Sequence, residues 1–252
     1  MDKLRKWGED PEFSGPRDWF RNSLIIKEII REKTKGKVLD FGVGSGNLLF
    51  RLAAKGFVCT GIDKSRLALN CLRLKAKEKG FADSIKAKEG DEGALTKIKQ
   101  NFDIVVSGET LEHLKDDQKT VKGFYRILKK GGICVVSVPA HMWLWDANDD
   151  FSAHYRRYEK PDLIRLLESE CFNIVRVYYW GFPLSLLWHR LVYLPLIFRK
   201  IKQKRIYTDS FGLLSSLIAN EQMKKFFSIP FWLDELFNWT MLGGGLILVA
   251  KK

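Results

Sequence analysis

The sequence KVLDFGVGSGNLL, residues 37–49, decides the fold of this chain. A short apolar run ends in three glycines at alternate positions, Gly42, Gly44 and Gly46, and a helix-forming segment follows. Glycine lets the backbone turn sharply and lets a ligand approach without a Cβ in the way. The spacing is G-x-G-x-G, not the G-x-G-x-x-G of dinucleotide sites, and no Walker-type Lys-Ser or Lys-Thr pair follows it. The pattern predicts a loop that holds a cofactor.

An acidic residue ends the second predicted strand, FVCTGID at 57–63. The carboxylate of Asp63 can accept hydrogen bonds from both ribose hydroxyls of an adenosine group. The alternative is that Asp63 caps the helix that begins within residues 64–70, and the two roles are compatible. Loop, strand and acid together predict a cofactor site.

The rest of the chain alternates between strand-like and helix-like segments. Further strands are predicted at 84–91, 102–108, 133–139, 172–180 and 245–252. A helix predicted at 116–130 ends at a Gly-Gly pair. Strands separated by helices favour a parallel sheet with helices on both faces. We therefore predict an α/β fold with a Rossmann-like, doubly wound, seven-stranded sheet, whose ligands bind beyond the carboxyl ends of the strands.

We predict a single domain with four parts. A length of 252 residues is near the upper limit for one hydrophobic core. The parts are an N-terminal helical cap (1–35), a cofactor-binding core (36–181), a helical insertion that faces substrate or membrane (182–241) and a last strand (242–252).

The chain is strongly basic. It has 43 Lys and Arg against 30 Asp and Glu, a formal net charge of +13. This balance favours a polyanionic neighbour such as nucleic acid, an acidic membrane surface or a phosphorylated substrate. The surplus lysines can equally form a solvated face.

Cysteine usage and the apolar runs predict a cytoplasmic location. The four cysteines form no C-x-x-C pair and are expected to be reduced core thiols. The N-terminal sequence lacks the apolar core of a signal peptide. The longest apolar stretch, 177–198, contains two prolines, a histidine and an arginine, so we predict no membrane span.

Five segments in order resemble the class I S-adenosylmethionine-dependent methyltransferases. They are VLDFGVGSG (38–46), GID (61–63), EGD (89–91), FDIVVSGETLEHL (102–114) and LKKGGICVVSVP (128–139). RDWFRNSLI (17–25) and HYRRYEKPDL (154–163) resemble a bacterial and archaeal subgroup. The quinone-biosynthesis O-methyltransferases resemble the chain more distantly.

The resemblance implies S-adenosylmethionine as the cofactor and S-adenosylhomocysteine as its product. The glycine loop would hold the methionine part of the cofactor. The acid after the second strand would bind the ribose, and the acids after the third strand would lie near the adenine. The end of the fourth strand would lie beside the sulfonium. The cofactor-binding residues implied or predicted are Asp40, Gly42, Gly44, Gly46, Asp63, Lys64, Asp91, Glu92, Ser107, Trp19 and Arg21.

Methyl transfer needs alignment of the acceptor and, for a hydroxyl or ammonium, a general base. His113, His154 and Glu109 are the candidate catalytic residues. The alternatives are that His113 begins a helix and that His154 and Arg156 pin a lid, the segment 139–163, over the strand ends. In the quinone O-methyltransferases a Glu-x-x-Glu-His segment implies a divalent metal. The matching ligands would be Glu109, Glu112 and His113, if the segment is helical.

The segment after the fourth strand bears on the acceptor. It reads SGET at 107–110, without the Asn/Asp-Pro-Pro-aromatic pattern of nucleic-acid amino methyltransferases. We therefore expect a small-molecule or lipid-like acceptor, O- or N-methylation, and no nucleic-acid partner. The alternatives are a nicotinamide-dependent dehydrogenase and a cofactor-binding regulatory protein without catalysis.

The insertion carries leucines at helical spacing followed by RKIKQKR at 199–205. An apolar helix face beside a basic cluster is typical of a segment that lies on an anionic membrane surface. This predicts peripheral membrane contact. The alternative is that the same leucines pack on the sheet or on a second subunit.

Overall fold

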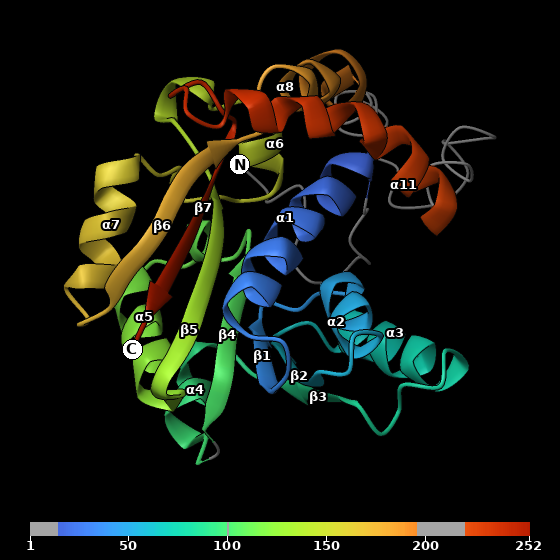
Figure 1. Ribbon diagram of the computed structural model, residues 1–252, viewed down its shortest axis with the longest axis vertical. Coiled ribbons are helices and arrows are strands. Elements are labelled where there is room, and N and C mark those ends of the chain that lie inside the picture. The colour runs from blue at the N-terminus through green and yellow to red at the C-terminus, as the bar shows by residue number, and fades with distance from the viewer. Residues whose placement is uncertain (1–14, 100, 196–219) are drawn as a thin grey trace.

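A computed structural model describes residues 15–99, 101–195 and 220–252. Its centre is a seven-stranded sheet with the strand order β3-β2-β1-β4-β5-β7-β6 (Figure 1). The strands are β1 (Lys37–Phe41), β2 (Val58–Asp63), β3 (Ile85–Glu89), β4 (Phe102–Gly108), β5 (Leu128–Pro139), β6 (Asn173–Trp180) and β7 (Gly245–Lys251). The predicted α/β fold is confirmed. The strand order reverses between β1 and β4, where doubly wound sheets bind their ligands.

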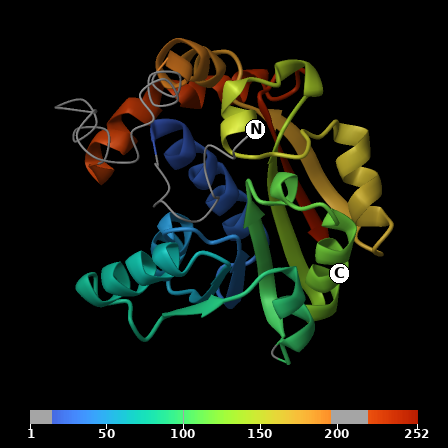
Figure 2. The ribbon, with the colours of Figure 1, turned by 180° about the vertical axis from the view of Figure 1, so that it is seen from behind.

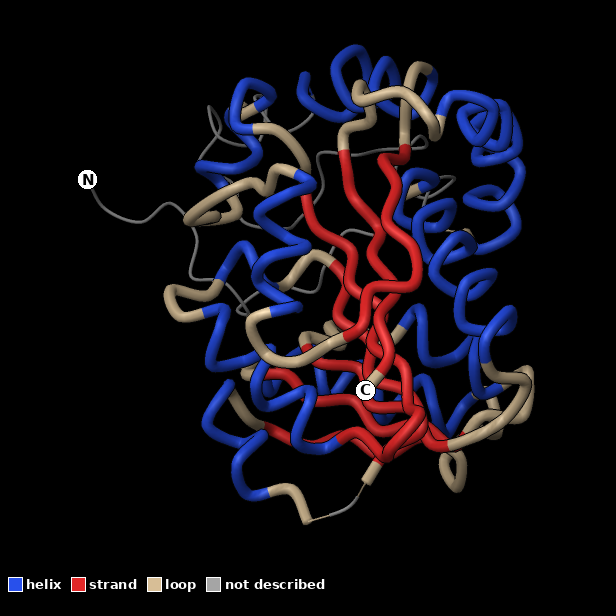
Figure 3. The backbone as a smooth tube through the Cα atoms, turned by 60° about the vertical axis from the view of Figure 1, so that its left-hand side comes forward, coloured by secondary structure: helices blue, strands red, loops and turns tan. Residues whose placement is uncertain are grey.

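Helices cover both faces of this sheet (Figure 3). Alternate strand residues supply two separate cores: Val38 and Ile104 face one side, and Leu39 and Val105 face the other. The first face is covered by α1 (Pro16–Glu32), α2 (Asn47–Ala53) and α3 (Arg66–Glu78), and the second by α4 (Glu92–Lys97), α5 (Asp117–Ile127) and α7 (Lys160–Glu168). Figure 2 shows the second layer from behind.

One strand departs from the predicted parallel sheet. β7 lies between β5 and β6 and runs antiparallel to both. A parallel strand needs a crossover that returns the chain to the opposite end of the sheet. β7 instead begins at Gly245, opposite Trp180 at the end of β6, and α8 (Leu184–Trp188) lies near that same end in Figure 1. The chain therefore re-enters the sheet from that end.

The junction of α5 and β5 also differs from the prediction. The helix ends at Ile127 and the strand begins at once, whereas the sequence predicted a helix to 130 and a strand from 133. Gly131 has a φ of 70° and lies in a register shift between β4 and β5. The Gly-Gly pair therefore forms an irregularity within the strand and does not stop the helix.

Short helical segments gather beyond the carboxyl ends of the strands. They are η1 (Leu111–His113), η2 (Met142–Leu144), α6 (Ala147–Phe151), α8 (Leu184–Trp188), η3 (His189–Tyr193), α11 (Glu221–Ser228) and η4 (Ile229–Phe237). α11 packs along α1. Among the described helices, none has both the length and the apolar character needed to cross a membrane. The basic run 199–205 lies outside the described residues.

All four cysteines are free thiols. Cys59 and Cys134 are buried, and burial, helped by Asp40, raises the pKa of Cys59 to about 12. These two are the inert core thiols that the sequence predicted. Cys171 is exposed and does not belong to the core.

Candidate active site

The glycine loop joins β1 to α2 at the switch point of the sheet. Gly42 has a φ of 78°, and a Cβ there would lie 2.2 Å from Thr110 Oγ1. Gly46 has a φ of 83° and begins α2. The first glycine is therefore required for the close approach of the segment after β4, and the last for the left-handed turn into the helix.

Asp63 holds this loop in place. Its carboxylate accepts hydrogen bonds from the Gly44 N–H and the Ser65 N–H, both at 2.8 Å, and its side chain is buried. The cap of α3 is Ser65, whose hydroxyl accepts from the Ala68 N–H, so the alternative role of Asp63 as that cap is wrong. The carboxylate lies at the carboxyl end of β2, and the ribose contact stays a prediction.

The acids predicted at the adenine lie at the end of β3. Asp91 is exposed and caps α4 by accepting from the Gly93 N–H at 2.9 Å. Glu92 is half-buried in the first turn of α4, and Lys64 is exposed at the end of β2. Because these strands are neighbours, the three side chains share one rim of the sheet. Their contacts to a cofactor remain predicted.

Asp40 and Ser107 lie in the interior of the strands. Asp40 is buried between Gly61 of β2 and Val106 of β4. The Ser107 hydroxyl donates to the Phe41 carbonyl at 3.2 Å and is 1% exposed. Ser107 thus ties β4 to the start of the glycine loop.

Trp19 and Arg21 project from α1 beside the loop helix α2. The Arg51 guanidinium lies 4.1 Å from the centre of a Trp19 ring, and Arg51 Nη1 donates to the Trp19 carbonyl. Arg21 Nη1 lies 3.5 Å from Asp18 Oδ1. These contacts fix α1 against α2, and closure over the cofactor remains a prediction.

Glu109 begins the chain segment after β4. Its φ is 54°, and its carboxylate accepts from the Ser137 hydroxyl of β5 at 3.1 Å. The left-handed residue breaks the predicted helix, and only a three-residue 3-10 turn, η1, follows. The predicted grouping of Glu109, Glu112 and His113 on one helical face is therefore wrong.

The structure brings His154 to this segment instead. The rings of His113 and His154 meet edge to face with centroids 4.5 Å apart. His154 Nδ1 lies 2.7 Å from Asp149 Oδ1, and the Asp149 carboxylate also accepts from Arg157 Nε and Nη2. Burial alone would raise the pKa of Asp149, but the bonds from His154 and Arg157 outweigh it and hold that pKa well below its usual range. An ionised Asp149 therefore fixes the orientation of His154.

The lid after β5 is pinned to α5 by other residues. Arg156 Nη1 and the Tyr158 hydroxyl both donate to Asp117 Oδ2, at 2.8 and 2.7 Å. The predicted pinning role of Arg156 is confirmed by this contact. His154 bonds instead through Nδ1 to Asp149 of the same lid.

Glu112 is completely buried behind His113. Both of its carboxylate oxygens lack a hydrogen-bond partner among the residues that the structure describes. Burial, and then the nearby Glu109 carboxylate, raise the pKa of Glu112 well above its usual value. The neutral acid is thus the favoured form when no cation is bound.

A divalent cation would have a different ligand set from the predicted one. Among the described residues, ligand atoms of Glu112, His113 and His154 lie within 4.8 Å of one another. A buried carboxylate and two imidazoles, one of them fixed through Nδ1 by an aspartate, form a plausible donor set. His154 therefore replaces Glu109 in the candidate metal site.

We expect Glu112→Gln to stabilise the protein increasingly as the pH rises. A raised pKa means that the stability provided by the neutral acid is fully present below the unfolded pKa and is lost as the pH rises through the folded pKa. Glutamine keeps the neutral shape and does not ionise. Thermal unfolding at pH 5, 6.5 and 8 should show a growing advantage for the variant, and the exposed Glu78→Gln should show none. An advantage that does not change with pH would contradict the burial argument.

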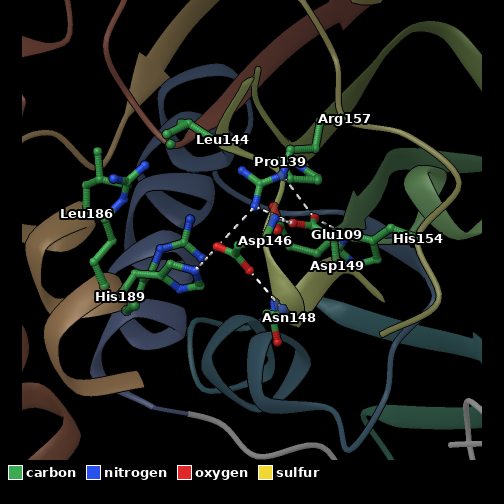
Figure 4. Close-up of a pocket in the computed structure, with 13 residues that line it drawn as sticks. Glu109, Pro139, Leu144, Asp146, Asn148, Asp149, His154, Arg157, Leu186 and His189 are labelled. Atoms are coloured by element: carbon green, nitrogen blue, oxygen red, sulfur yellow. Dashed lines mark hydrogen bonds and ion pairs between the residues drawn. The ribbon is translucent and has the colours of Figure 1, made fainter. Parts of the chain in front are cut away.

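A small pocket of about 30 Å³ opens beside these residues (Figure 4). Glu109 and His154 line it, together with Leu144, Asp149 and His189. Figure 4 shows His154 and Glu109 on the same side of the cavity. His113 contacts the His154 ring and is not among the lining residues.

The sequence analysis assigned no role to several residues of this cavity. His189 Nε2 lies 2.9 Å from Asp146 Oδ2, and Arg157 Nη2 lies 3.7 Å from the same oxygen (Figure 4). The short spacing of Asp149 and His154 could have suggested a pair, since one turn and a loop separate them. Nothing local predicts His189, because only the fold brings η3 over the lid.

Comparisons with known proteins place the chain in a family. The model of a protein family described as a methyltransferase domain matches residues 32–192. A ubiquinone biosynthesis O-methyltransferase of Coxiella burnetii is 36% identical over 113 residues, 44% of this chain and 47% of that protein. An uncharacterized methyltransferase of Bacillus cereus is 35% identical over 127 residues, 50% of this chain and 56% of that protein. The matches span about half the length of these curated relatives.

Solved structures show the same fold at low sequence identity. A phosphoethanolamine N-methyltransferase of Haemonchus contortus in complex with S-adenosyl-L-methionine aligns with a TM-score of 0.63 and 19% identity, over 96% of this chain and 54% of that one. The [4+2]-cyclase SpnF aligns with a TM-score of 0.64 and 18% identity, over 98% of this chain and 86% of that one. The matched region contains the glycine loop and the strands β1 to β6, so the chain belongs to the methyltransferase-domain family.

Proposed function

We propose that the protein transfers the methyl group of S-adenosylmethionine to an oxygen or nitrogen of a small-molecule or lipid-like acceptor. The observation that carries this proposal is the position of the Asp149–His154 pair. It lies beside Glu109, just beyond the end of β4 and across the switch point from the glycine loop. The loop has the open backbone and the buried acid that such a cofactor needs.

When bound, S-adenosylmethionine would supply an activated methyl group, and its sulfur would keep the electron pair of the carbon–sulfur bond that breaks. The Glu109 carboxylate, held by Ser137, provides negative charge near that cation. His154 Nε2 takes a proton from the acceptor: an ammonium loses it first, which frees the nitrogen lone pair, and a hydroxyl loses it as the oxygen lone pair forms the new bond to carbon. Asp149 stabilises the resulting imidazolium, and the lid excludes water.

The test is incubation of the protein with isotopically labelled methyl donor and a cell extract. We expect S-adenosylhomocysteine to form together with a labelled small or lipid-soluble product, detected by mass spectrometry. Label in nucleic acid would show that the proposed acceptor class is wrong. Slow hydrolysis without any labelled product would favour the non-catalytic alternative.

Calorimetry separates the proposal from a nicotinamide-dependent dehydrogenase. We expect S-adenosylmethionine and S-adenosylhomocysteine to bind and NAD to show no heat of binding, because the glycine spacing lacks the dinucleotide pattern. Tight NAD binding would reverse the assignment.

The metal requirement is tested on the same reaction. We expect EDTA to leave turnover unchanged, because Glu112 is buried in a form that favours its neutral acid. Loss of turnover that magnesium restores would assign Glu112, His113 and His154 as ligands.

We also infer that the end of the molecule around η4 contacts an anionic membrane surface. Leu233, Leu236, Trp239 and Met241 are 57, 68, 83 and 74% exposed. Single exposed apolar residues are ordinary, but a run of them is typical of an interaction surface. The leucines of the insertion fall into two groups. Leu187 and Leu191 are exposed, whereas Leu184 packs against the core, as the alternative of packing on the sheet predicts.

We expect the protein to sediment with vesicles of phosphatidylglycerol and phosphatidylcholine, and more weakly at high salt. The double variant Leu236→Ser/Trp239→Ser should lose about 1 kcal/mol per side chain, or roughly fivefold each. Leu74→Ser, a 63% exposed leucine on α3, is the matched control. Removing the charges of 199–205 should weaken binding further. Absence of sedimentation at low salt would leave η4 as a surface for substrate or for a second subunit.

A further inference from the structure

The cavity contains cationic side chains that form no ion pair with its acidic residues. Asp149 accepts from His154 and Arg157, and Asp146 pairs with His189. Arg17 of α1 and Arg190 of η3 line the same cavity. Within the described part of the chain, neither of these two guanidinium groups has a hydrogen bond or an ion pair.

Arg17 is held in position without an acid. Its guanidinium carbon lies 4.7 Å from the centre of a ring of Trp180, which is 1% exposed. Gly245 makes room for the Trp180 ring, because a Cβ there would lie 2.4 Å from Trp180 Nε1. Stacking fixes the plane of the guanidinium and leaves its N–H edges to bind a ligand.

The surroundings of Arg17 favour an added negative charge. Burial lowers the pKa of Arg17, the Glu109 and Asp18 carboxylates oppose this, and Arg21 and Arg157 lower the pKa further. A guanidinium withdrawn from water without a partner is unfavourable, and a carboxylate or phosphate would supply two charge-assisted hydrogen bonds. Glu109 faces the site of the sulfonium in the proposed function and would be balanced by it.

We propose that Arg17 and Arg190 bind an anionic group, a carboxylate or a phosphate, of the methyl acceptor. The inference rests on the proposed function, because the anion would lie in the cavity that Glu109 and His154 line. Leu144 and Leu186 line the same cavity and can contact an apolar body of the acceptor. The acceptor class is therefore an amphipathic acid, with its anion at α1 and η3 and its nucleophile near His154.

The test uses benzoate, phenyl phosphate and the neutral analogue benzamide. Each is titrated calorimetrically into the full chain, with and without saturating S-adenosylhomocysteine. We expect at least one anionic probe to bind in the millimolar range, at least tenfold more tightly than benzamide, and the stronger of the two identifies the anion. Arg17→Gln and Arg190→Gln should each weaken that probe at least tenfold, and Arg17→Lys less, since lysine keeps the charge without the fork. Arg31→Gln, exposed on the same helix, should leave binding unchanged.

Binding of S-adenosylhomocysteine to the same variants distinguishes the possible failures. Unchanged affinity in Arg17→Gln supports an acceptor site, and a parallel tenfold loss would assign Arg17 to the cofactor carboxylate and overturn the inference. Equal binding of benzamide and the anions would also overturn it, as would anion binding that survives both glutamine variants. If the parent binds anions but no S-adenosylhomocysteine, the proposed function fails and the anion site stands. Arg190 is exposed, so its variant reports on the site even if Arg17→Gln unfolds.

Discussion

His154→Ala should lower kcat by about 10²–10⁴-fold while changing the affinity for S-adenosylmethionine little. The imidazole is fixed through Nδ1 by a buried aspartate and lines the cavity, so its loss removes the proton acceptor and leaves the glycine loop intact. Single-turnover kinetics that follow formation of the labelled product of the extract assay would measure the rate of the chemical step. Added imidazole should restore part of the rate.

His113→Ala is the matched comparison for this prediction. Its ring contacts His154 but does not line the cavity, so we expect a smaller loss, caused by a looser His154. A larger loss in His113→Ala than in His154→Ala would exchange their roles. A loss under threefold in both would leave positioning of the acceptor as the whole of catalysis.

Asp63→Ala should weaken S-adenosylmethionine binding by roughly 10- to 100-fold, about 1.5–3 kcal/mol. Two effects add: the predicted ribose contact is lost, and the Gly44 and Ser65 N–H groups lose their acceptor. Because Asp63 is buried, the variant should also unfold at a lower temperature. Calorimetric titration and a thermal scan measure the two effects separately.

Asp63→Asn separates the contributions, because it keeps one acceptor oxygen for the loop and removes the charge. Its stability should lie between those of the parent and Asp63→Ala. Asp83→Ala, an exposed acid near the end of α3, should bind S-adenosylmethionine as the parent does. If Asp63→Ala binds S-adenosylmethionine as tightly as the parent does, Asp63 does not bind the ribose.

The sequence predicted the elements whose signal is local. The short apolar run that ends in alternating glycines marks β1 and its loop, and the β-branched run at 102–108 matches the bounds of β4. Both signals come from neighbouring residues, so no tertiary information is needed. The direction of β7 was missed because it depends on where the insertion leaves the chain, which no local pattern records.

The candidate site was predicted only in part for the same reason. His154 and Glu109 were found because a loop after a strand is a short-range feature. The helical face predicted for Glu109, Glu112 and His113 does not form, because Glu109 is left-handed and only a three-residue turn follows it. The pairs His189–Asp146 and Arg17–Trp180 join elements far apart in the sequence, and only their packing reveals them.

The position of β7 bears on how the chain folds. β5 and β6 have no hydrogen bonds to each other and are joined only through Gly245–Lys251. During synthesis, one half of the sheet, from β3 to β5, can assemble early, whereas β6 must wait for the segment that arrives last of the seven strands. We expect a chain truncated before residue 245 to remain bound to chaperones or to be degraded, because the unpaired edges of β5 and β6 stay open. Completion of this sheet is thus a late, long-range event that sets the pace of folding.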